Sequence, residues 1–527
     1  MGFIRKNIIL RLLLVLTAVL VPFEWIGTAT AAQVDKVISF GIQSVKTITI
    51  RPFEPVERDM LSVYDLVYES LVVIDENYMP QPYLAERWEE SSGGKYWTFY
   101  LRRDVKFSNG EPLTAEDVVA SARYILDKAN DENITDHGFY SNLKYFVSNI
   151  SVKDEYTVTV KTSRPYFGLL YAMTFPVVPA ASVADDNPPG SGPYMILEFH
   201  PGESMWMSVN KGWWKTSPQV QEIDFMLHET ARQVIESYEF GRVNAIFTRS
   251  IAGAQYKTGT SSVSMNYRTN QLECLLMNNS SYELTENGRK AIRCVIDKSR
   301  LIATAYSGMA RETEFPFYPG TWMYNSSYDG LWKKDVEKAK QLLAEDGWED
   351  SDENGILDRI NSKGKQVNLS LRLYYYEEPD NDVRAVAVNM ISDALQEIGI
   401  ECRIDAMTLP NLEAKLKAGS YDLALVSYAM DVCPDPGFIL MKGNTGNYVR
   451  YKSEKMDNLC KSLRTQVSQE GFRQKLMDIQ ALFYEDCPFL CLYWRTGTVV
   501  SRYMYTTNRD VREYQLLRGI QSFITRK

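Results

Sequence analysis

The residues best suited to binding a charged small molecule lie in segment 421–440, YDLALVSYAMDVCPDPGFIL. An apolar, strand-like run that includes Tyr428 leads directly into a Pro-Asp-Pro turn. This turn carries the carboxylates of Asp431 and Asp435 and the thiol of Cys433. Carboxylates form strong, charge-assisted hydrogen bonds with cationic groups. Because ligands of open parallel sheets lie beyond the carboxyl ends of the strands, the turn is a candidate binding site.

A purely structural role for the same aspartates is the competing interpretation, since Asp beside Pro commonly stabilises turns. No catalytic motif accompanies the turn: the sequence contains no GxSxG, Walker A or HExxH pattern. The three histidines, His137, His200 and His228, are far apart, so neither a His-based nucleophile nor a zinc site is expected. We therefore expect no enzyme activity, no metal site and no cofactor, with a hydrolytic enzyme as the alternative from another functional class.

Length and charge restrict the possible partners. A chain of 527 residues is too long for one ordinary core, so two or three domains are expected. The formal net charge is −9 and there are no basic clusters, which argues against nucleic acid and against an anionic membrane surface as partners.

The N-terminal 31 residues have the order of a secretory signal. Arg5, Lys6 and Arg11 precede an apolar run over 12–21, and Ala29-Thr30-Ala31 offers a small-x-small cleavage site. The first cysteine is Cys274, so no lipid-anchor cysteine follows the apolar run. We expect a periplasmic or otherwise extracytoplasmic protein, with an uncleaved N-terminal anchor as the alternative.

Elements in the first third are predicted from alternation and turn chemistry. Segment 68–124 is interpreted as a strand, an acidic turn, a short helix over 84–88, a Ser-Ser-Gly-Gly turn, an alternating strand and a helix that begins at Thr114. Two alternating runs around Asp154 and Glu155 predict a hairpin. The breaker cluster DDNPPGSGPY, 185–194, predicts a tight turn near a domain boundary.

The C-terminal half alternates strands and helices. Strands are predicted over 367–376, 401–406 and 421–427, separated by helices over 382–398 and 409–419. This β-α-β-α-β order is typical of a parallel sheet covered by helices, so the C-terminal region is predicted to be α/β.

Several collinear motifs resemble a known family. They are YESL at 68–71, LAERW at 84–88, segment 107–117, GSGPY at 190–194, Tyr421-Asp422 and CPFL at 487–490. Together they resemble the family 5 extracellular solute-binding proteins of ABC transporters, the oligopeptide, dipeptide and nickel group, over about residues 37–520.

The resemblance implies an α/β, two-lobed periplasmic-binding-protein fold of type II, with an extra small α+β domain in the N-terminal lobe. The implied division is a signal peptide at 1–31, the first part of lobe I at 32–66, the extra domain at 67–188, the second part of lobe I at 189–272, the C-terminal lobe at 273–500 and a return to lobe I at 501–527.

The resemblance also implies a function. A monomeric protein would capture short peptides between its lobes and deliver them to the membrane permease of an ABC importer; nickel, a metallophore or another non-peptide solute is the alternative. Asp431 would pair with the ligand amine and Tyr428 would form a pocket wall, with Cys433 and Asp435 beside them. Aligned from the Pro-Asp-Pro side, Val432 would take the amine-binding position instead.

Cysteine usage leaves the thiols largely unpaired. The seven cysteines are an odd number, so at least one stays free even in an oxidising compartment. By analogy with oligopeptide-binding members, we expect one disulfide, between Cys274 and Cys433.

Overall fold

The computed structural model describes residues 37–520, apart from positions 45, 92, 135, 258–261, 332, 362, 379–380 and 503–510. The predicted signal peptide at 1–31 therefore lies outside the described residues, as does 521–527.

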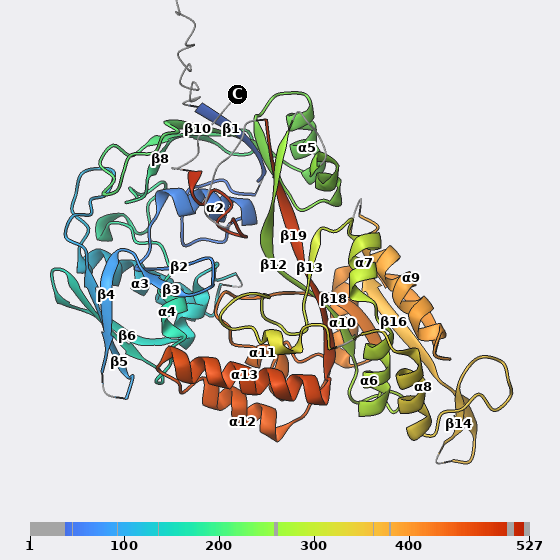
Figure 1. The fold of residues 1–527 in the computed structure, drawn as a ribbon. Coiled ribbons are helices and arrows are strands. Elements are labelled where there is room, and N and C mark those ends of the chain that lie inside the picture. Colours follow the sequence, from blue (N-terminus) through green and yellow to red (C-terminus); the bar gives the residue numbers. More distant parts are fainter. Residues whose placement is uncertain are drawn as a thin grey trace, which may run out of the picture.

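One large sheet connects the two lobes of the molecule (Figure 1). Its eleven strands run in the order β17 (Glu401–Met407), β16 (Ser370–Tyr376), β18 (Leu423–Ala429), β12 (Val263–Met277), β19 (Phe489–Ser501), β11 (Ala245–Thr248), β1 (Val37–Gln43), β10 (Glu222–His228), β9 (Ser204–Val209) and β8 (Tyr194–His200), with β13 (Ala310–Glu312) also paired to β19. The long antiparallel strands β12 and β19 pass from one lobe into the other, so both lobes share them.

The C-terminal lobe is built on the β16–β18 end of this sheet. Strand β16 pairs in parallel with both β17 and β18, which confirms the parallel arrangement predicted from the alternation of strands and helices. The segment from β12 to β19 also contains α6 (Glu286–Val295), α7 (Lys298–Ala305), a 3-10 turn (Ser326–Tyr328), α8 (Val336–Glu345), β14 (Asp358–Ile360), β15 (Gln366–Asn368), α9 (Val383–Gln396), α10 (Leu409–Ala418), α11 (Gly437–Leu440), α12 (Glu454–Leu463) and α13 (Gln469–Asp486).

The N-terminal lobe combines the β1 and β8–β11 end of the large sheet with a small domain. The small domain contains a four-stranded antiparallel sheet in the order β4 (Ala85–Glu90), β5 (Tyr96–Leu101), β7 (Thr157–Thr162) and β6 (Val147–Asp154). The remaining elements of this lobe are α2 (Arg58–Val67), β2 (Val72–Ile74), β3 (Pro80–Pro82), α3 (Ala115–Asn130), α4 (Leu169–Ala172), α5 (Ala231–Glu239) and the 3-10 turns Ser141–Tyr145, Ala180–Ser182 and Ile251–Lys257.

Two local predictions for the small domain are confirmed and one is wrong. Helix α3 starts at Thr114, whose backbone N–H donates to the Asp117 carboxylate at 2.8 Å, and β6 and β7 form the predicted hairpin. The helix predicted over 84–88 is instead strand β4, in which Trp88 lies opposite Phe99 of β5. Cross-strand packing of these aromatic side chains outweighs the helix propensity of the Leu-Ala-Glu-Arg run.

A close backbone contact joins the small domain to the rest of its lobe. The predicted turn at 190–194 packs on the end of α2, and a Cβ on Gly190 would lie 1.9 Å from the carbonyl oxygen of Val67. Only glycine fits there without a shift of the backbone. Next to it, the buried carboxylate of Glu69 accepts hydrogen bonds from Ser191 Oγ and from the indoles of Trp213 and Trp214, at 2.8–3.0 Å.

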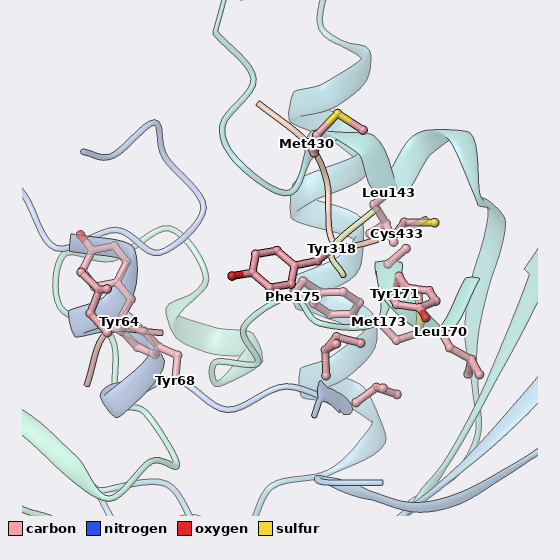
Figure 2. Packing of buried hydrophobic residues seen from close by; sticks show 14 of the residues in the cluster. Tyr64, Tyr68, Leu143, Leu170, Tyr171, Met173, Phe175, Tyr318, Met430 and Cys433 are labelled. Carbon is pink, nitrogen blue, oxygen red and sulfur yellow. The ribbon is translucent and has the colours of Figure 1, made fainter. Parts of the chain in front are cut away.

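The two lobes are in contact around one shared hydrophobic core. Figure 2 shows Leu143 and Tyr171 of the N-terminal lobe beside Tyr318, Met430 and Cys433 of the C-terminal lobe, and all five belong to one buried cluster. The main chain also crosses the boundary, because the N–H of Phe167 donates to the carbonyl of Gln466 at 2.7 Å. The structure is therefore a closed arrangement of the lobes.

Candidate ligand-binding site

A cavity of about 250 Å³ lies between the lobes. Its walls come from three parts of the chain. They are Tyr78, Phe139, Tyr140, Asn142, Tyr171, Ala172 and Thr174 of the N-terminal lobe; 268–270, Trp494 and 512–514 at the crossing strands and the C-terminal segment; and 316–318, Met323 and 429–436 of the C-terminal lobe. The aromatic rings of Tyr78 and Tyr318 stack across the lobe boundary with their centroids 6.2 Å apart.

An irregularity in the large sheet exposes part of β12 to this cavity. The pairing of β12 with β19 shifts register between Arg268 and Leu272, and the skipped residues Thr269 and Asn270 line the cavity. Bulges of this kind re-aim side chains near functional sites. The amide nitrogen of Asn270 donates to Tyr514 Oη at 2.8 Å, while its buried Oδ1 has no hydrogen-bond partner among the described residues.

Asp431 lies on the cavity wall just beyond the end of β18. Its Oδ2 accepts from Asn142 Nδ2 of the opposite lobe at 2.9 Å, and its Oδ1 accepts from the backbone N–H of Cys433 at 3.1 Å. No cationic side chain of the described residues forms an ion pair with it. A carboxylate with two oxygens has lone pairs left after two such bonds, so it can still accept from a ligand.

The surroundings of Asp431 raise its pKa. Burial in the cavity wall is the largest cause, and the nearby charge of Asp435 adds to it, although the hydrogen bonds from Cys433 and Asn142 act in the opposite direction. The side chain is still open to solvent through the cavity. A ligand cation placed beside it would compensate the cost of keeping this carboxylate ionised.

Asp435 borders the same cavity, but its carboxylate is already satisfied by the protein. It forms an ion pair with Arg464 at 2.6 Å and accepts from Tyr166 Oη at 2.9 Å and from the N–H of Gly437 at 2.9 Å. The two aspartates of the turn therefore differ. Asp435 stabilises the turn and the contact between the lobes, whereas the carboxylate of Asp431 remains available to a ligand.

Tyr428 does not form a wall of the cavity, contrary to the prediction. It is buried in the C-terminal lobe, donates from its hydroxyl to the carbonyl of Gly446 at 2.8 Å and stacks on Tyr448. Alternation along β18 explains the error: when Tyr428 faces the core, its neighbour Ala429 faces the other side. Ala429, Met430 and Val432 line the cavity instead.

The disulfide predicted between Cys274 and Cys433 is not present in the structure, where both thiols are free. Cys274 lies within the sheet, where it pairs with Val426 of β18 and with Cys491 of β19. Val426 is seven positions before Cys433 in the sequence, so the sheet register does not bring Cys274 next to Cys433. Cys433 instead lines the cavity, with its sulfur 3.7 Å from Tyr166 Oη. Burial raises the pKa of the Cys433 thiol well above its usual value, so it is a packed thiol rather than a reactive one.

Several cavity residues had no signal in the sequence. Asn142, Asn270 and Arg512 lie far from Asp431 along the chain and belong to no motif. They meet because the loop after α3, the irregular part of β12 and the C-terminal segment converge at the lobe boundary.

Comparisons with known proteins agree with this architecture. The family model described as bacterial extracellular solute-binding proteins, family 5 middle, matches residues 79–449. The chain belongs to this family. Proteins of this kind capture solutes outside the cytoplasm for ABC importers and work with permease subunits, and most relatives of this chain are named as binding proteins.

Individual relatives of this family 5 protein are distant but cover most of it. The oligopeptide-binding protein AppA of Bacillus subtilis is 23% identical over 479 residues, which is 85% of this chain and 85% of AppA. The nickel-binding protein NikA of Staphylococcus aureus is 24% identical over 401 residues, 74% of this chain and 75% of that protein.

A solved structure with similarly low sequence identity supports the fold. NikA of Brucella suis in complex with Fe(III)-EDTA superposes with a TM-score of 0.76 at 20% identity, over 94% of this chain and all of that one. The predicted two-lobed α/β fold is thereby confirmed, whereas the exact domain boundaries stay predictions. In the described part of the chain, no helix has the length and apolar character needed to cross a bilayer.

Proposed function

We propose that this family 5 protein captures short peptides with a free amino terminus in the interlobe cavity and delivers them to an ABC permease. The open carboxylate of Asp431 carries the proposal: it lines the cavity, has no cationic partner among the described residues, and is held in place by Asn142 and the Cys433 N–H. A protonated α-amine is the ligand group that fits such a carboxylate.

Other features of the cavity are suited to a peptide main chain. Asn270 and Glu513 line the cavity, and Oδ1 of Asn270 and Oε2 of Glu513, both buried, lack hydrogen-bond partners among the described residues. Either can accept from a peptide N–H. Aromatic side chains from both lobes, such as Tyr171, Tyr318 and Trp494, supply apolar walls for ligand side chains.

A chelated metal is the second candidate. Nickel-binding proteins are among the relatives, and the guanidinium groups of Arg268 and Arg512 on the cavity wall match the carboxylates of a chelator. Such a ligand would not require the negative charge of Asp431, so the variant below separates the two candidates.

Replacing Asp431 by asparagine is expected to weaken the binding of a free tripeptide by about 1.5–3 kcal/mol, the scale of a hydrogen bond to a charged group. Asparagine keeps the size and one acceptor but removes the negative charge. N-acetylation of the tripeptide should weaken binding to the wild-type protein by a similar amount and have little further effect on the variant. Isothermal titration calorimetry with both peptides and both proteins measures all four affinities.

Asp405→Asn is the matched control, because Asp405 is an exposed carboxylate on β17, outside the cavity. The affinity of the Asp405→Asn variant for the free tripeptide should equal that of the wild type. If acetylated and free peptides bind the wild type equally well, Asp431 does not hold the amine and the proposed function is wrong in that respect.

Peptide affinity should also fall on acidification. The pKa of Asp431 is raised above the ordinary aspartate value of 3.8, and the amine needs the ionised carboxylate. Affinity is therefore full well above that raised pKa and declines as the pH falls through it, at a higher pH than an ordinary aspartate would give. Titrations over descending pH measure this, and Asp431→Asn should remove the dependence. If the variant kept the same pH profile, the pH dependence of peptide affinity would belong to another titratable group.

A further inference from the structure

The cavity also contains a buried guanidinium without a carboxylate partner. Arg512 is 5% exposed and lines the cavity from the C-terminal segment. Its Nε donates to Gln515 Oε1 at 2.8 Å, Nη1 to the carbonyl of Asp75 at 2.9 Å and Nη2 to the carbonyl of Ile74 at 2.5 Å. These three acceptors are neutral, and a guanidinium has five N–H groups, so donors remain for another acceptor.

The electrostatic surroundings of Arg512 are unfavourable for a cation. Burial lowers its pKa to about 10, and the positive charges of Arg518 and Arg268 act in the same direction. Asp65 is the carboxylate that favours the charged form most, and no carboxylate of the described residues lies within ion-pair distance of Arg512. Leaving a cation buried without an anion is costly, and a bound anion would remove that cost.

Arg268 adds a second guanidinium to the same wall. Its backbone forms an isolated β-bridge with that of Arg512. Its guanidinium group lies over the ring of Tyr318, 4.6 Å from the ring centroid. Both guanidinium groups also lie over the ring of Tyr78, at 5.9 Å for Arg268 and 5.2 Å for Arg512. Each guanidinium group is held against the ring of Tyr78 and donates to a main-chain carbonyl, Arg268 to that of Glu76 at 2.9 Å, so the pair is preorganised for an anion.

Arg512 and Asp431 therefore present opposite charges, neither of them ion-paired within the described residues, to the same cavity. We infer that the ligand is a small zwitterion whose carboxylate binds Arg512, with Arg268 beside it, while its amine binds Asp431. The inference rests on the proposed function for the amine end only; the anionic end stands on Arg512 itself. Both termini must then fit inside one cavity, so short peptides with a free carboxyl terminus are preferred over long ones.

The test uses one tripeptide in four forms: free, N-acetylated, C-amidated and doubly blocked. Calorimetric titration of the wild type should show the C-amide binding about tenfold or more weakly than the free acid, because it loses a charge-assisted contact. In Arg512→Gln, most of the preference for the free acid over the amide should be lost, because only Arg268 remains at the anionic end. Arg403→Gln, which changes an exposed cation on β17, should retain the wild-type preference.

A second pair of ligands tests the anion site without peptides and on the wild-type protein alone, so the result does not depend on whether the variant folds. The nickel complexes of histidine and of histidinamide differ in the carboxylate, and the wild type should prefer the histidine complex. Loss of binding on amidation without loss on acetylation supports the anion site and contradicts the amine site. Loss on acetylation alone does the reverse. If no carboxylate-bearing probe binds better than its amide, the inference is overturned, even if Asp431 is correct.

Discussion

Replacing Arg384 by methionine is expected to lower the free energy of unfolding by about 3–5 kcal/mol, because it leaves a buried carboxylate without its main partner. Arg384 of α9 is 1% exposed and Glu273 of β12 is fully buried, and they form an ion pair at 2.7 Å. Glu378 binds both Arg384 and Arg495, so the four side chains form one network in the C-terminal lobe. Glu273 would keep only the longer contact with Arg495, at 3.7 Å.

Urea denaturation followed by circular dichroism measures this loss, with Arg403→Met as the matched control. Arg403 pairs with Glu401 at 3.1 Å, but on the surface, so its replacement should change stability by less than about 1 kcal/mol. The double replacement of Arg384 and Glu273 by methionine should recover part of the loss, because the buried carboxylate is then gone. Equal stability of the Arg384 and Arg403 variants would show that the network contributes nothing.

Replacing Glu69 by alanine is expected to cost about 3 kcal/mol or more of unfolding free energy, since donors to a charged group each contribute about 1.5–3 kcal/mol and are not additive. Glu69 is 3% exposed and accepts from Ser191 Oγ and from the indole nitrogens of Trp213 and Trp214. The buried donors of Ser191 and Trp213 would lose their acceptor, and the junction between the small domain and the large sheet would loosen.

Tryptophan fluorescence during urea denaturation reports directly on this junction, because two of its donors are indoles. Glu86→Ala is the control: Glu86 is an exposed carboxylate on the neighbouring strand β4, and its removal should leave the transition unchanged. Destabilisation of both variants to the same degree would mean that loss of a negative charge, rather than loss of the buried acceptor, is responsible.

Much of the fold could be predicted because it depends on local patterns. The parallel order of β16, β17 and β18, the start of α3 at Thr114 and the hairpin of β6 and β7 follow from periodicity and capping residues that adjacent sequence supplies. The failure at 84–88 shows the limit: Trp88 joins a strand because Phe99 lies opposite, which propensity within the segment cannot reveal.

The sequence predicts the location of the binding site correctly but identifies only some of the residues that line it. The turn after β18 does border the cavity, and Asp431 and Cys433 line it. Tyr428 faces the core instead, and Asp435 is occupied by Arg464 and Tyr166. Both facts depend on which side of a strand is buried and on which distant cation arrives, and neither is encoded within the turn.

The sequence by itself determined the family, the two-lobed α/β architecture and the turn at which a ligand would bind, because collinear motifs and hydrophobic periodicity are properties of short segments. Only the tertiary structure decided which charges stay available to a ligand. Asp431 lacks a cation and Arg512 lacks an anion within the described residues because closure of the lobes brings residues hundreds of positions apart to one cavity and leaves these two unpaired there. Charge pairing is a property of three-dimensional neighbours, so no pattern along the chain could have shown it.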